Sequence, residues 1–311
     1  QVSSPDQHGN CSLGISVEAT AAACEVAGKI IAHVNPNMPR THGDSFINLK
    51  DIDHAFMDDT PLILHEPREI SATERRIGEN IASLIDDGDC LQMGIGAIPD
   101  AALACLEERR DLGVHTEMFS DGVLKLIDCG AINNSRKKIG RGKVVTGFTM
   151  GSQKLYDFVN DNPEVVFLDI EFVNNPVVIA KNRQVTSINS AIQIDLSGQV
   201  CADSMGAKIY SGVGGQVDFV LGATFSEGGK SIIALPSTAR NGSLSRLVPT
   251  LERGAGVVTT RAHVDYVVTE FGIAELRGRS IAERVRDLIA IAHPKFQESM
   301  AREARDLLGV R

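Results

Sequence analysis

The chain has 311 residues, a net charge of −9 and a pI of about 5.4, with 43% hydrophobic and 23% charged residues. This composition predicts a soluble globular protein with enough length to bury a core in one large or two smaller domains. The acidic balance argues against a nucleic-acid partner, and no apolar run has the length of a membrane span. An anionic ligand is not excluded, because backbone N–H groups bind phosphate without lysine or arginine.

The cysteines point to a reducing compartment. No two of the six form a C-x-x-C pair, and no Cys/His cluster has zinc spacing, so we expect no metal site. No permanently bound cofactor is expected either, on separate grounds given with the motifs below. Cysteines scattered through apolar runs are typical of reduced core residues, which favours a cytoplasmic location. They are Cys11, Cys24, Cys90, Cys105, Cys129 and Cys201.

Residues 1–68 mix strands and turns. A small-residue helix is expected at 19–28, and short strands are expected at 29–34, 45–49 and 60–67. The sequence begins at Gln1, without a methionine, and enters a strand-and-turn pattern directly, which we interpret as a truncated or processed start.

From Ser71 onward the pattern changes to helices alternating with short apolar strands. Ser71 and Glu74 form a capping box for an amphipathic helix at 71–85. The alternation predicts an α/β fold with an open, mostly parallel sheet and flanking helices. We expect strands at 90–93, 114–117, 144–147, 165–168, 185–188, 231–235, 257–260 and 264–268, and helices at 99–110, 121–129, 152–160, 219–223, 272–276, 281–292 and 294–308.

The first candidate site is the glycine loop G-I-G-A-I-P-D at residues 94–100, which follows a strand and opens a helix. Its glycines let the backbone approach a ligand, and the helix N-terminus favours an anion. A plain strand–helix turn explains the same pattern. It is not the dinucleotide fingerprint, because Pro99 takes the third glycine position.

The second candidate is H-T-E-M-F-S-D-G at residues 115–122, in which Glu117 closes an apolar strand. A carboxylate there would lie at the ligand-binding edge of an open α/β sheet, and carboxylates are known nucleophiles. On spacing alone, a solvent-exposed strand-end residue is the simpler interpretation. His115 is more readily explained as structural than catalytic.

Three further stretches carry weaker signals. The glycine loop Y-S-G-V-G-G-Q-V-D-F at residues 210–219 again precedes a helix, and Lys230 lies just before an apolar strand. Glu270 precedes an expected short helix, and Glu275 lies within it. Their spacing does not place them on one helix face, so a dipole role for Glu270 and a solvated Glu275 are favoured.

Taken together, these stretches resemble the acetyl-CoA hydrolase/transferase family, nearest its 4-hydroxybutyrate CoA-transferase branch. The matching strings keep the family's order over nearly the whole chain. They include S-P-D-Q-H-G-N-C-S-L-G, M-P-R-T-H-G-D-S, Q-M-G-I-G-A-I-P-D-A, L-G-V-H-T-E-M-F-S-D-G-V, I-N-S-A-I-Q-I-D-L-S-G-Q-V, G-V-G-G-Q-V-D-F, G-G-K-S-I-I-A-L-P-S-T-A and V-V-T-E-F-G-I-A-E-L-R-G.

The resemblance implies two related α/β domains with the active site between them. Residues 1–68 would be the tail of the first CoA-transferase domain, and residues 69–311 would be the whole second domain. Because family members carry a further N-terminal segment, we expect part of one cleft wall to lie outside this sequence.

The resemblance also implies the chemistry and the site residues. CoA would move between an acyl-CoA of the acetyl, butyryl or 4-hydroxybutyryl type and a small carboxylic acid, by a ping-pong route through a glutamyl-CoA thioester on Glu117. Coenzyme A and acyl-CoA would be substrates, and a homodimer is expected. The positions similar to CoA-binding residues are Gly94, Ile95, Gly96, Ala97, Ile98, Ile192, Ser211, Gly215 and Lys230.

Three alternatives stay open. If water intercepts the covalent intermediate, the net reaction is acyl-CoA hydrolysis. A non-catalytic CoA-binding subunit is compatible with an incomplete cleft, and the strand–glycine–helix turns are compatible with a nucleotide-binding oxidoreductase.

Overall fold

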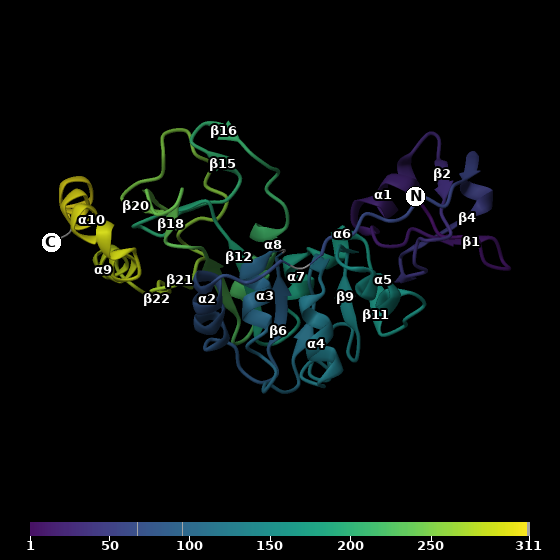
Figure 1. The fold of residues 1–311 in the computed structure, drawn as a ribbon, viewed down its shortest axis with the longest axis horizontal. Coiled ribbons are helices and arrows are strands. Elements are labelled where there is room, and N and C mark those ends of the chain that lie inside the picture. The colour runs from purple at the N-terminus through teal and green to yellow at the C-terminus, as the bar shows by residue number, and fades with distance from the viewer. Residues whose placement is uncertain (67, 95, 310–311) are drawn as a thin grey trace.

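The computed structural model describes residues 1–66, 68–94 and 96–309, and its centre is an open six-stranded sheet (Figure 1). The strand order is β22-β21-β17-β12-β6-β7, and every neighbouring pair is parallel except β21 and β22. The fold is therefore the open, mostly parallel α/β arrangement expected from the sequence. The bounds are β6 Cys90–Met93, β7 Gly113–Val114, β12 Val185–Ser190, β17 Lys230–Ala234, β21 Tyr266–Thr269 and β22 Gly272–Glu275.

A second set of strands continues this sheet beyond β7. Strands β3 (His42–Gly43), β11 (Val165–Phe167) and β9 (Val144–Thr146) form a parallel sheet in the order β3-β11-β9. A bridge between His115 and Val145 joins it to the segment after β7. Further on, β8 (Met118–Phe119) pairs with β10 (Phe148–Thr149).

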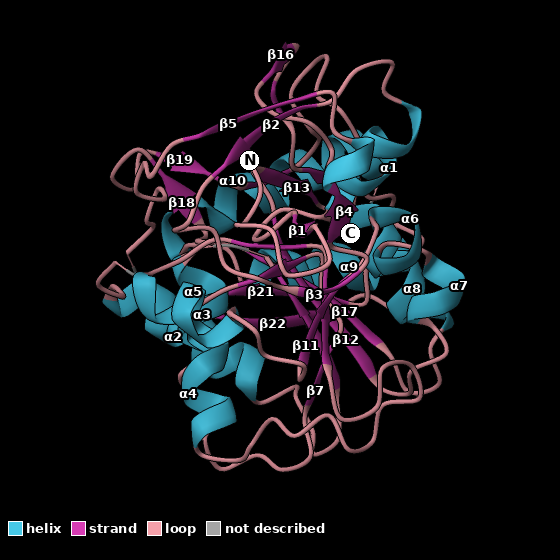
Figure 2. Cartoon of the chain, turned by 90° about the vertical axis from the view of Figure 1, so that its right-hand side faces the viewer, coloured by secondary structure: helices cyan, strands magenta, loops and turns pink. Residues whose placement is uncertain are grey.

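Helices cover both faces of the central sheet (Figure 2). Helix α2 contacts β21 and β17, whereas α8 contacts β12 and β17. Figure 2 shows α2, α3, α4 and α5 on one side of the strands and α7 and α8 on the other. The bounds are α2 Ala72–Ala82, α3 Ala97–Leu103, α4 Gly122–Asp128, α5 Gln153–Val159, α6 Ile170–Val173, α7 Pro176–Ile179 and α8 Gln216–Phe225.

The N-terminal segment shares its core with the sheet. Buried Cys11, Val17 and Ile47 belong to one apolar cluster with Ile77 and Phe167. Strand β3 of this segment pairs with β11, so residues 1–66 contribute an edge to the sheet as well. The segment also contains β1 Asn10–Ser12, α1 Glu18–Val26, β2 Ile31–Val34, β4 Phe46–Asn48, the 3₁₀ helix Leu49–Asp51 and β5 His54–Met57.

A second apolar cluster lies under the C-terminal helices α9 (Ile281–Ala290) and α10 (Pro294–Leu308). Figure 1 shows these helices at the end of the molecule opposite α1. The other strands of this part are β13 Gln193–Asp195, β14 Val200–Cys201, β15 Ser204–Met205, β16 Lys208–Ile209, β18 Thr238–Ala239, β19 Leu244–Ser245 and β20 Leu247–Val248.

Several local predictions are confirmed. The capping box is present, with Ser71 N donating to Glu74 Oε2 at 2.9 Å and Glu74 N donating to Ser71 Oγ at 3.3 Å. The strands expected at 90–93 and 185–188 form β6 and most of β12. Within the described residues, no helix is long and apolar enough to cross a membrane.

Five local predictions are wrong in whole or in part. The expected helix at 272–276 is strand β22, which pairs with β21 across a tight turn in which Gly272 has a φ of +143°. Glu270 therefore does not lie at a helix N-terminus. Its carboxylate instead accepts hydrogen bonds from Ser237 N at 2.8 Å and Ser237 Oγ at 2.6 Å. At 257–260 only Thr259 makes a bridge, to Val200.

Residues 60–66 form no strand, and Pro67 lies outside the described residues. The helix expected at 99–110 is shorter, ending at Leu103.

Candidate functional site

Glu117 lies just beyond β7, where the chain leaves the central sheet and enters β8. Its backbone carbonyl accepts hydrogen bonds from Gly147 N at 3.0 Å and Phe148 N at 3.1 Å. Glu117 follows the carboxyl end of β7. Since β7 runs parallel to β6, Glu117 lies at the edge of the sheet where the parallel strands end. This is the edge at which open α/β sheets bind ligands, as the sequence pattern predicts.

Two groups from distant parts of the chain lie at the Glu117 carboxylate. Gly215 N, at the start of α8, donates to Oε2 at 3.1 Å, and the amide of Asn174 lies close enough to lower the pKa of Glu117. The φ of Gly215 is −82°, which any residue adopts. A Cβ there would lie 2.5 Å from Asn174 Nδ2 and closer still to Glu117 Oε2, so glycine is required for space and not for its backbone.

The surroundings of Glu117 favour a reactive carboxylate. Burial raises the pKa of Glu117, the nearby Asn174 amide and the Gly215 N–H lower it, and the negative charge of Asp218 raises it again. The Asn174 amide also lowers the pKa of Asp218, so this amide lies near both carboxylates. Carboxylates that are partly removed from water, with a backbone donor on one oxygen, occur among the covalent nucleophiles of enzymes.

His115 supports this arrangement from inside the protein. Its Nε2 lies 2.9 Å from the carbonyl oxygen of Val173, the residue before Asn174, and its ring packs edge-on against Phe219 of α8. Burial lowers the pKa of His115 to about 4, so the ring is neutral near pH 7 and Nε2–H donates to Val173. His115 thus contacts both segments that hold Glu117, as expected for a structural histidine.

A second glutamate approaches from the N-terminal segment. Glu18, the first residue of α1, donates its backbone N–H to the Gly147 carbonyl at 3.1 Å. Its Oε1 accepts a hydrogen bond from Ser16 Oγ at 2.8 Å. Burial raises the pKa of Glu18, and the negative charge of Glu117 adds to the rise.

Buried polar atoms without partners surround Glu117. Glu18 Oε2, Asn174 Oδ1 and Gln216 Nε2 have no hydrogen-bond partner among the residues that the structure describes. Gln216 follows Gly215 directly, and Asn174 lies near Glu117. Buried polar groups are normally satisfied, so these unpaired atoms mark a polar region in this part of the fold.

The structure brings the first glycine loop to the same place. Met93 N donates to Thr116 Oγ1 at 3.3 Å, so the loop beginning at Gly94 starts beside the residue before Glu117. Gly96 has a φ of +121°, which only glycine adopts readily, and it caps α3, which starts at Ala97.

Ile98 packs against the core from the first turn of α3. Ile95 lies outside the described residues.

Ile192 also lies at this edge of the sheet, because it follows β12. Strands β6 and β12 are neighbours whose next strands, β7 and β17, extend the sheet in opposite directions. Ligands of open α/β sheets bind at such a switch point. The loops after these strands carry Gly94 and Ile192, which supports placing a ligand between them.

Ser211 and Lys230 are placed differently. Ser211 is exposed in the loop that leads to Gly215, with its N–H bonded to the Asp203 carbonyl at 3.1 Å. Lys230 begins β17, so it lies at the amino edge of the parallel strands, opposite Glu117.

The Lys230 ammonium is engaged at that edge, with the Leu84 carbonyl at 2.7 Å, Asp86 at 2.6 Å and Asp89 at 3.4 Å. The structure does not bring Lys230 to Glu117. Its assignment to the CoA site stays a prediction, which these contacts do not support.

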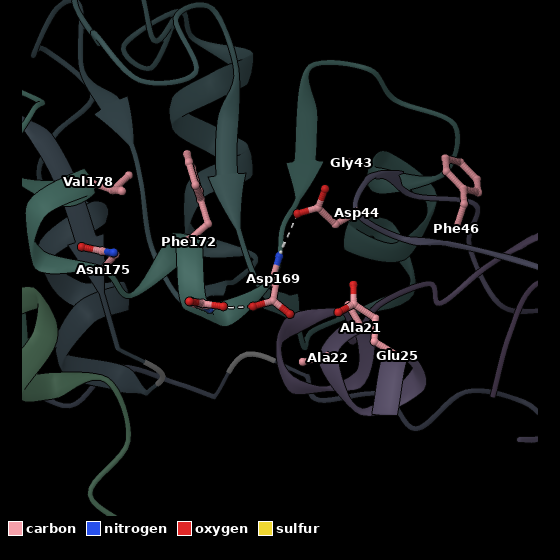
Figure 3. Close-up of a pocket in the computed structure, with 11 residues that line it drawn as sticks. Ala21, Ala22, Glu25, Gly43, Asp44, Phe46, Asp169, Phe172, Asn175 and Val178 are labelled. Carbon is pink, nitrogen blue, oxygen red and sulfur yellow. Dashed lines mark hydrogen bonds between the residues drawn. The ribbon is translucent and has the colours of Figure 1, made fainter. Parts of the chain in front are cut away.

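A groove of 720 Å³ runs beside the site, between α1 and the helices α6 and α7 (Figure 3). Its walls carry Glu25, Asp44, Asp169 and Glu171, and Asp169 N donates to Asp44 Oδ2 at 3.2 Å. An acidic groove disfavours the phosphates of CoA.

Sequence reasoning missed Glu18, Asn174 and Asp218. The Asn-Asn-Pro run that contains Asn174 signals a helix start, and Asn175 does cap α7. No local pattern links Asn174 or Glu18 to Glu117, because both contacts join segments far apart in the chain.

Family models match both ends of the sequence. The acetyl-CoA hydrolase/transferase N-terminal domain matches residues 1–64, and the C-terminal domain matches residues 151–304. The 4-hydroxybutyrate coenzyme A transferase of Clostridium kluyveri is 55% identical over 97% of the chain and 71% of that protein. A succinyl-CoA:acetate/propanoyl-CoA:succinate CoA transferase of Fasciola hepatica is 50% identical over 99% of the chain and 65% of that protein.

Solved structures agree with this relationship. The crystal structure of a 4-hydroxybutyrate CoA-transferase from Porphyromonas gingivalis matches 98% of the chain and 73% of that protein, with a TM-score of 0.89 and 46% identity. An acetyl-CoA hydrolase of Kluyveromyces lactis is a more distant match, 28% identical over 67% of the chain. The chain spans 65 to 73% of the length of the three transferases. The chain therefore belongs to the acetyl-CoA hydrolase/transferase family, and its high-identity relatives are CoA transferases.

Proposed function

We propose that this chain carries the nucleophile of a CoA transferase, and that Glu117 is that nucleophile. The observation that carries the proposal is the half-buried Glu117 carboxylate, bonded by Gly215 N and close to Asn174, beside the glycine loop that begins at Gly94. The donor would be an acyl-CoA of the acetyl, butyryl or 4-hydroxybutyryl type, and the acceptor a small carboxylic acid.

The reaction proceeds through two covalent intermediates on Glu117. A carboxylate oxygen attacks the thioester carbonyl, the C–S bond breaks, and CoA leaves as a thiolate from a mixed anhydride. The thiolate then attacks the Glu117 carbonyl carbon, and the first acid leaves as a carboxylate from a glutamyl-CoA thioester. A second acid repeats these steps in reverse order, which gives ping-pong kinetics.

Gly215 N has a specific part in this sequence. When the thiolate attacks the Glu117 carbonyl, negative charge develops on a carboxyl oxygen of Glu117. Gly215 N already lies 3.1 Å from Oε2, so it is positioned to stabilise that charge without rearrangement. The CoA contacts we propose are those of Gly94, Ile95, Gly96, Ala97, Ile98, Ile192, Ser211 and Gly215, with Lys230 as the least supported position.

The test is the fate of Glu117 after treatment with acyl-CoA. Mass spectrometry of wild-type enzyme should find CoA attached to Glu117, and borohydride should reduce that thioester. Glu117→Ala and Glu117→Gln should lose both the adduct and the exchange of label between acyl-CoA and free acid. Glu108→Gln, an exposed glutamate on the loop after α3, is the control and should retain both. If Glu117→Ala still exchanges label between acyl-CoA and free acid at the wild-type rate, Glu117 is not the nucleophile.

The same assay separates transfer from hydrolysis. Transfer conserves the thioester and converts an added acid into its acyl-CoA, whereas hydrolysis releases free thiol without an acceptor. We propose transfer, since the high-identity relatives are named as transferases.

We also propose a homodimer in a reducing, cytoplasmic setting. Its support is the family resemblance and the six cysteines, all of which are free thiols. Analytical ultracentrifugation of the enzyme tests the oligomeric state.

A further inference from the structure

Arg246 is a partly buried cation whose side chain contacts the end of β12. It lies between β19 and β20, where its N–H donates to Ser237 O at 2.9 Å and its carbonyl accepts from Ile194 N at 2.9 Å. Its Nη1 donates to Ala191 O at 3.2 Å, and its buried Nε has no partner among the described residues. Burial lowers the pKa of Arg246, and within the same residues no carboxylate forms an ion pair with it.

A guanidinium in this position is stabilised when an anion meets it. Taking a charge out of water is unfavourable unless an opposite charge or several hydrogen bonds replace the lost hydration. The planar fork of arginine N–H groups matches the oxygens of a carboxylate or a phosphate. The Ala191 carbonyl accepts one of these N–H groups, so Arg246 has further donors for an anionic ligand.

The end of β12 is open to a ligand. Ser190, the last residue of β12, is exposed, and Ile192 and Arg246 are partly exposed. On the neighbouring strand, Gly94 N at the start of the first glycine loop donates to Ile188 O of β12 at 3.2 Å. The guanidinium and this glycine loop therefore share one strand end, at the switch point where open α/β sheets bind ligands.

The separation from Glu117 decides which anion fits. Glu117 follows β7, and β6 lies between β7 and β12. Neighbouring strands are about 4.8 Å apart, so the ends of β7 and β12 are roughly 10 Å apart. The carboxylate of an acceptor acid must lie about 3–3.5 Å from the Glu117 carbonyl carbon to react, so it does not reach Arg246. The phosphates of CoA lie at the far end of the pantetheine arm from the thiol, and they match this separation.

We propose that Arg246 binds a phosphate group of the coenzyme A moiety, with the thioester of the same molecule directed toward Glu117. The proposal rests on the function proposed above, since it concerns the CoA moiety of that reaction. The N–H groups of Arg246 that Ala191 leaves free form charge-assisted hydrogen bonds to phosphate oxygens. The phosphate also supplies the counter-ion that the guanidinium lacks in the free protein.

The test compares a substrate that carries the phosphates with one that lacks them. With acetyl-CoA, Arg246→Ala should lower kcat/KM about 10- to 100-fold, the range for a hydrogen bond between charged groups. With S-acetylpantetheine, which has no phosphate, the variant and the wild-type enzyme should have the same kcat/KM. Arg302→Ala, at an exposed arginine of α10, is the matched control and should match wild type with both substrates. An equal loss with both substrates overturns the proposal, because altered packing at Ala191 would then explain it.

Two further variants separate charge from packing. Arg246→Gln keeps a donor for the Ala191 carbonyl but loses the charge, so it should show the same phosphate-dependent loss. It replaces Arg246→Ala if that variant does not fold. Arg246→Lys keeps the charge without the planar fork and should recover part of kcat/KM for acetyl-CoA. Wild-type kcat/KM for acetyl-CoA in Arg246→Gln would contradict the proposal.

The acid substrate provides a second comparison. In Arg246→Ala, kcat/KM for the acceptor acid should not change, whether the acid carries one carboxylate or two. A fall in kcat/KM for the acid, with an unchanged value for acetyl-CoA, overturns the proposal, because Arg246 would then bind the acid.

Failure of the proposed function appears in a different measurement. At saturating acetyl-CoA, Arg246→Ala should form the glutamyl-CoA adduct on Glu117 as the wild-type enzyme does. An adduct in both proteins, with an unchanged kcat/KM for acetyl-CoA in the variant, overturns the Arg246 proposal alone. A wild-type enzyme that forms no adduct on Glu117 overturns the proposed function.

Discussion

Gly215→Ala tests whether the space beside Glu117 is essential. The added methyl group would lie 2.5 Å from Asn174 Nδ2 and closer still to Glu117 Oε2. Ordinary contact requires these side chains to retreat by about 1 Å, a misplacement that typically costs about 100-fold in rate. We therefore expect kcat/KM to fall about 100-fold, which corresponds to about 2.7 kcal/mol of transition-state stabilisation.

Folding should change little in this variant, because a φ of −82° suits alanine. The assay is steady-state transfer from acyl-CoA to acid, together with the midpoint of thermal unfolding. Gly28→Ala is the matched control, since it adds a methyl group with no atom within 4 Å and needs no unusual backbone angle. A wild-type value of kcat/KM in Gly215→Ala would show that the space beside Glu117 is not essential. A loss of activity accompanied by a lowered melting temperature would also contradict the prediction, because unfolding would then explain the loss.

Three further outcomes are expected. The rate of glutamyl-CoA formation should rise as the pH rises through the raised pKa of Glu117, because only the ionised carboxylate attacks. Stopped-flow mixing with acyl-CoA measures this rate, and a rate that falls with rising pH would contradict the prediction. His115→Phe removes the donor to Val173 and should lower kcat about 10-fold or more with little change in the KM for acyl-CoA, whereas His115→Gln, which can donate, should recover part of the loss. Gly78→Ala places a methyl group 2.5 Å from the backbone of α3 and should lower the free energy of unfolding by about 1–3 kcal/mol, as measured by urea titration. An unchanged free energy of unfolding would mean that α2 and α3 can move apart without cost, contrary to this prediction.

Features that depend on short stretches of sequence could be predicted. The Ser71 capping box and the strand–glycine–helix turn at Gly94 each involve neighbours in the chain, and both are present. The parallel sheet also followed from the alternation of strands and helices.

Features that depend on pairing between distant segments could not be predicted. The stretch after Gly272 has a helix-like composition, but its backbone groups bond to β21, so it forms a strand. Glu18 and Asn174 reach Glu117 only after the chain has folded. Residue type and spacing therefore indicated the sheet edge where Glu117 lies but not the side chains that surround it.

The shared sheet and core of the N-terminal segment limit how this protein can be recombined with its relatives. An exchange of residues 1–64, the part that matches the N-terminal domain model, would cut the pairing of β3 with β11. It would also separate Val17 and Ile47 from the apolar cluster that contains Phe167. A chimera joined at that boundary takes β3 and β11 from different parents, so its folding depends on how well the two parents match at this strand pair and in the shared apolar cluster.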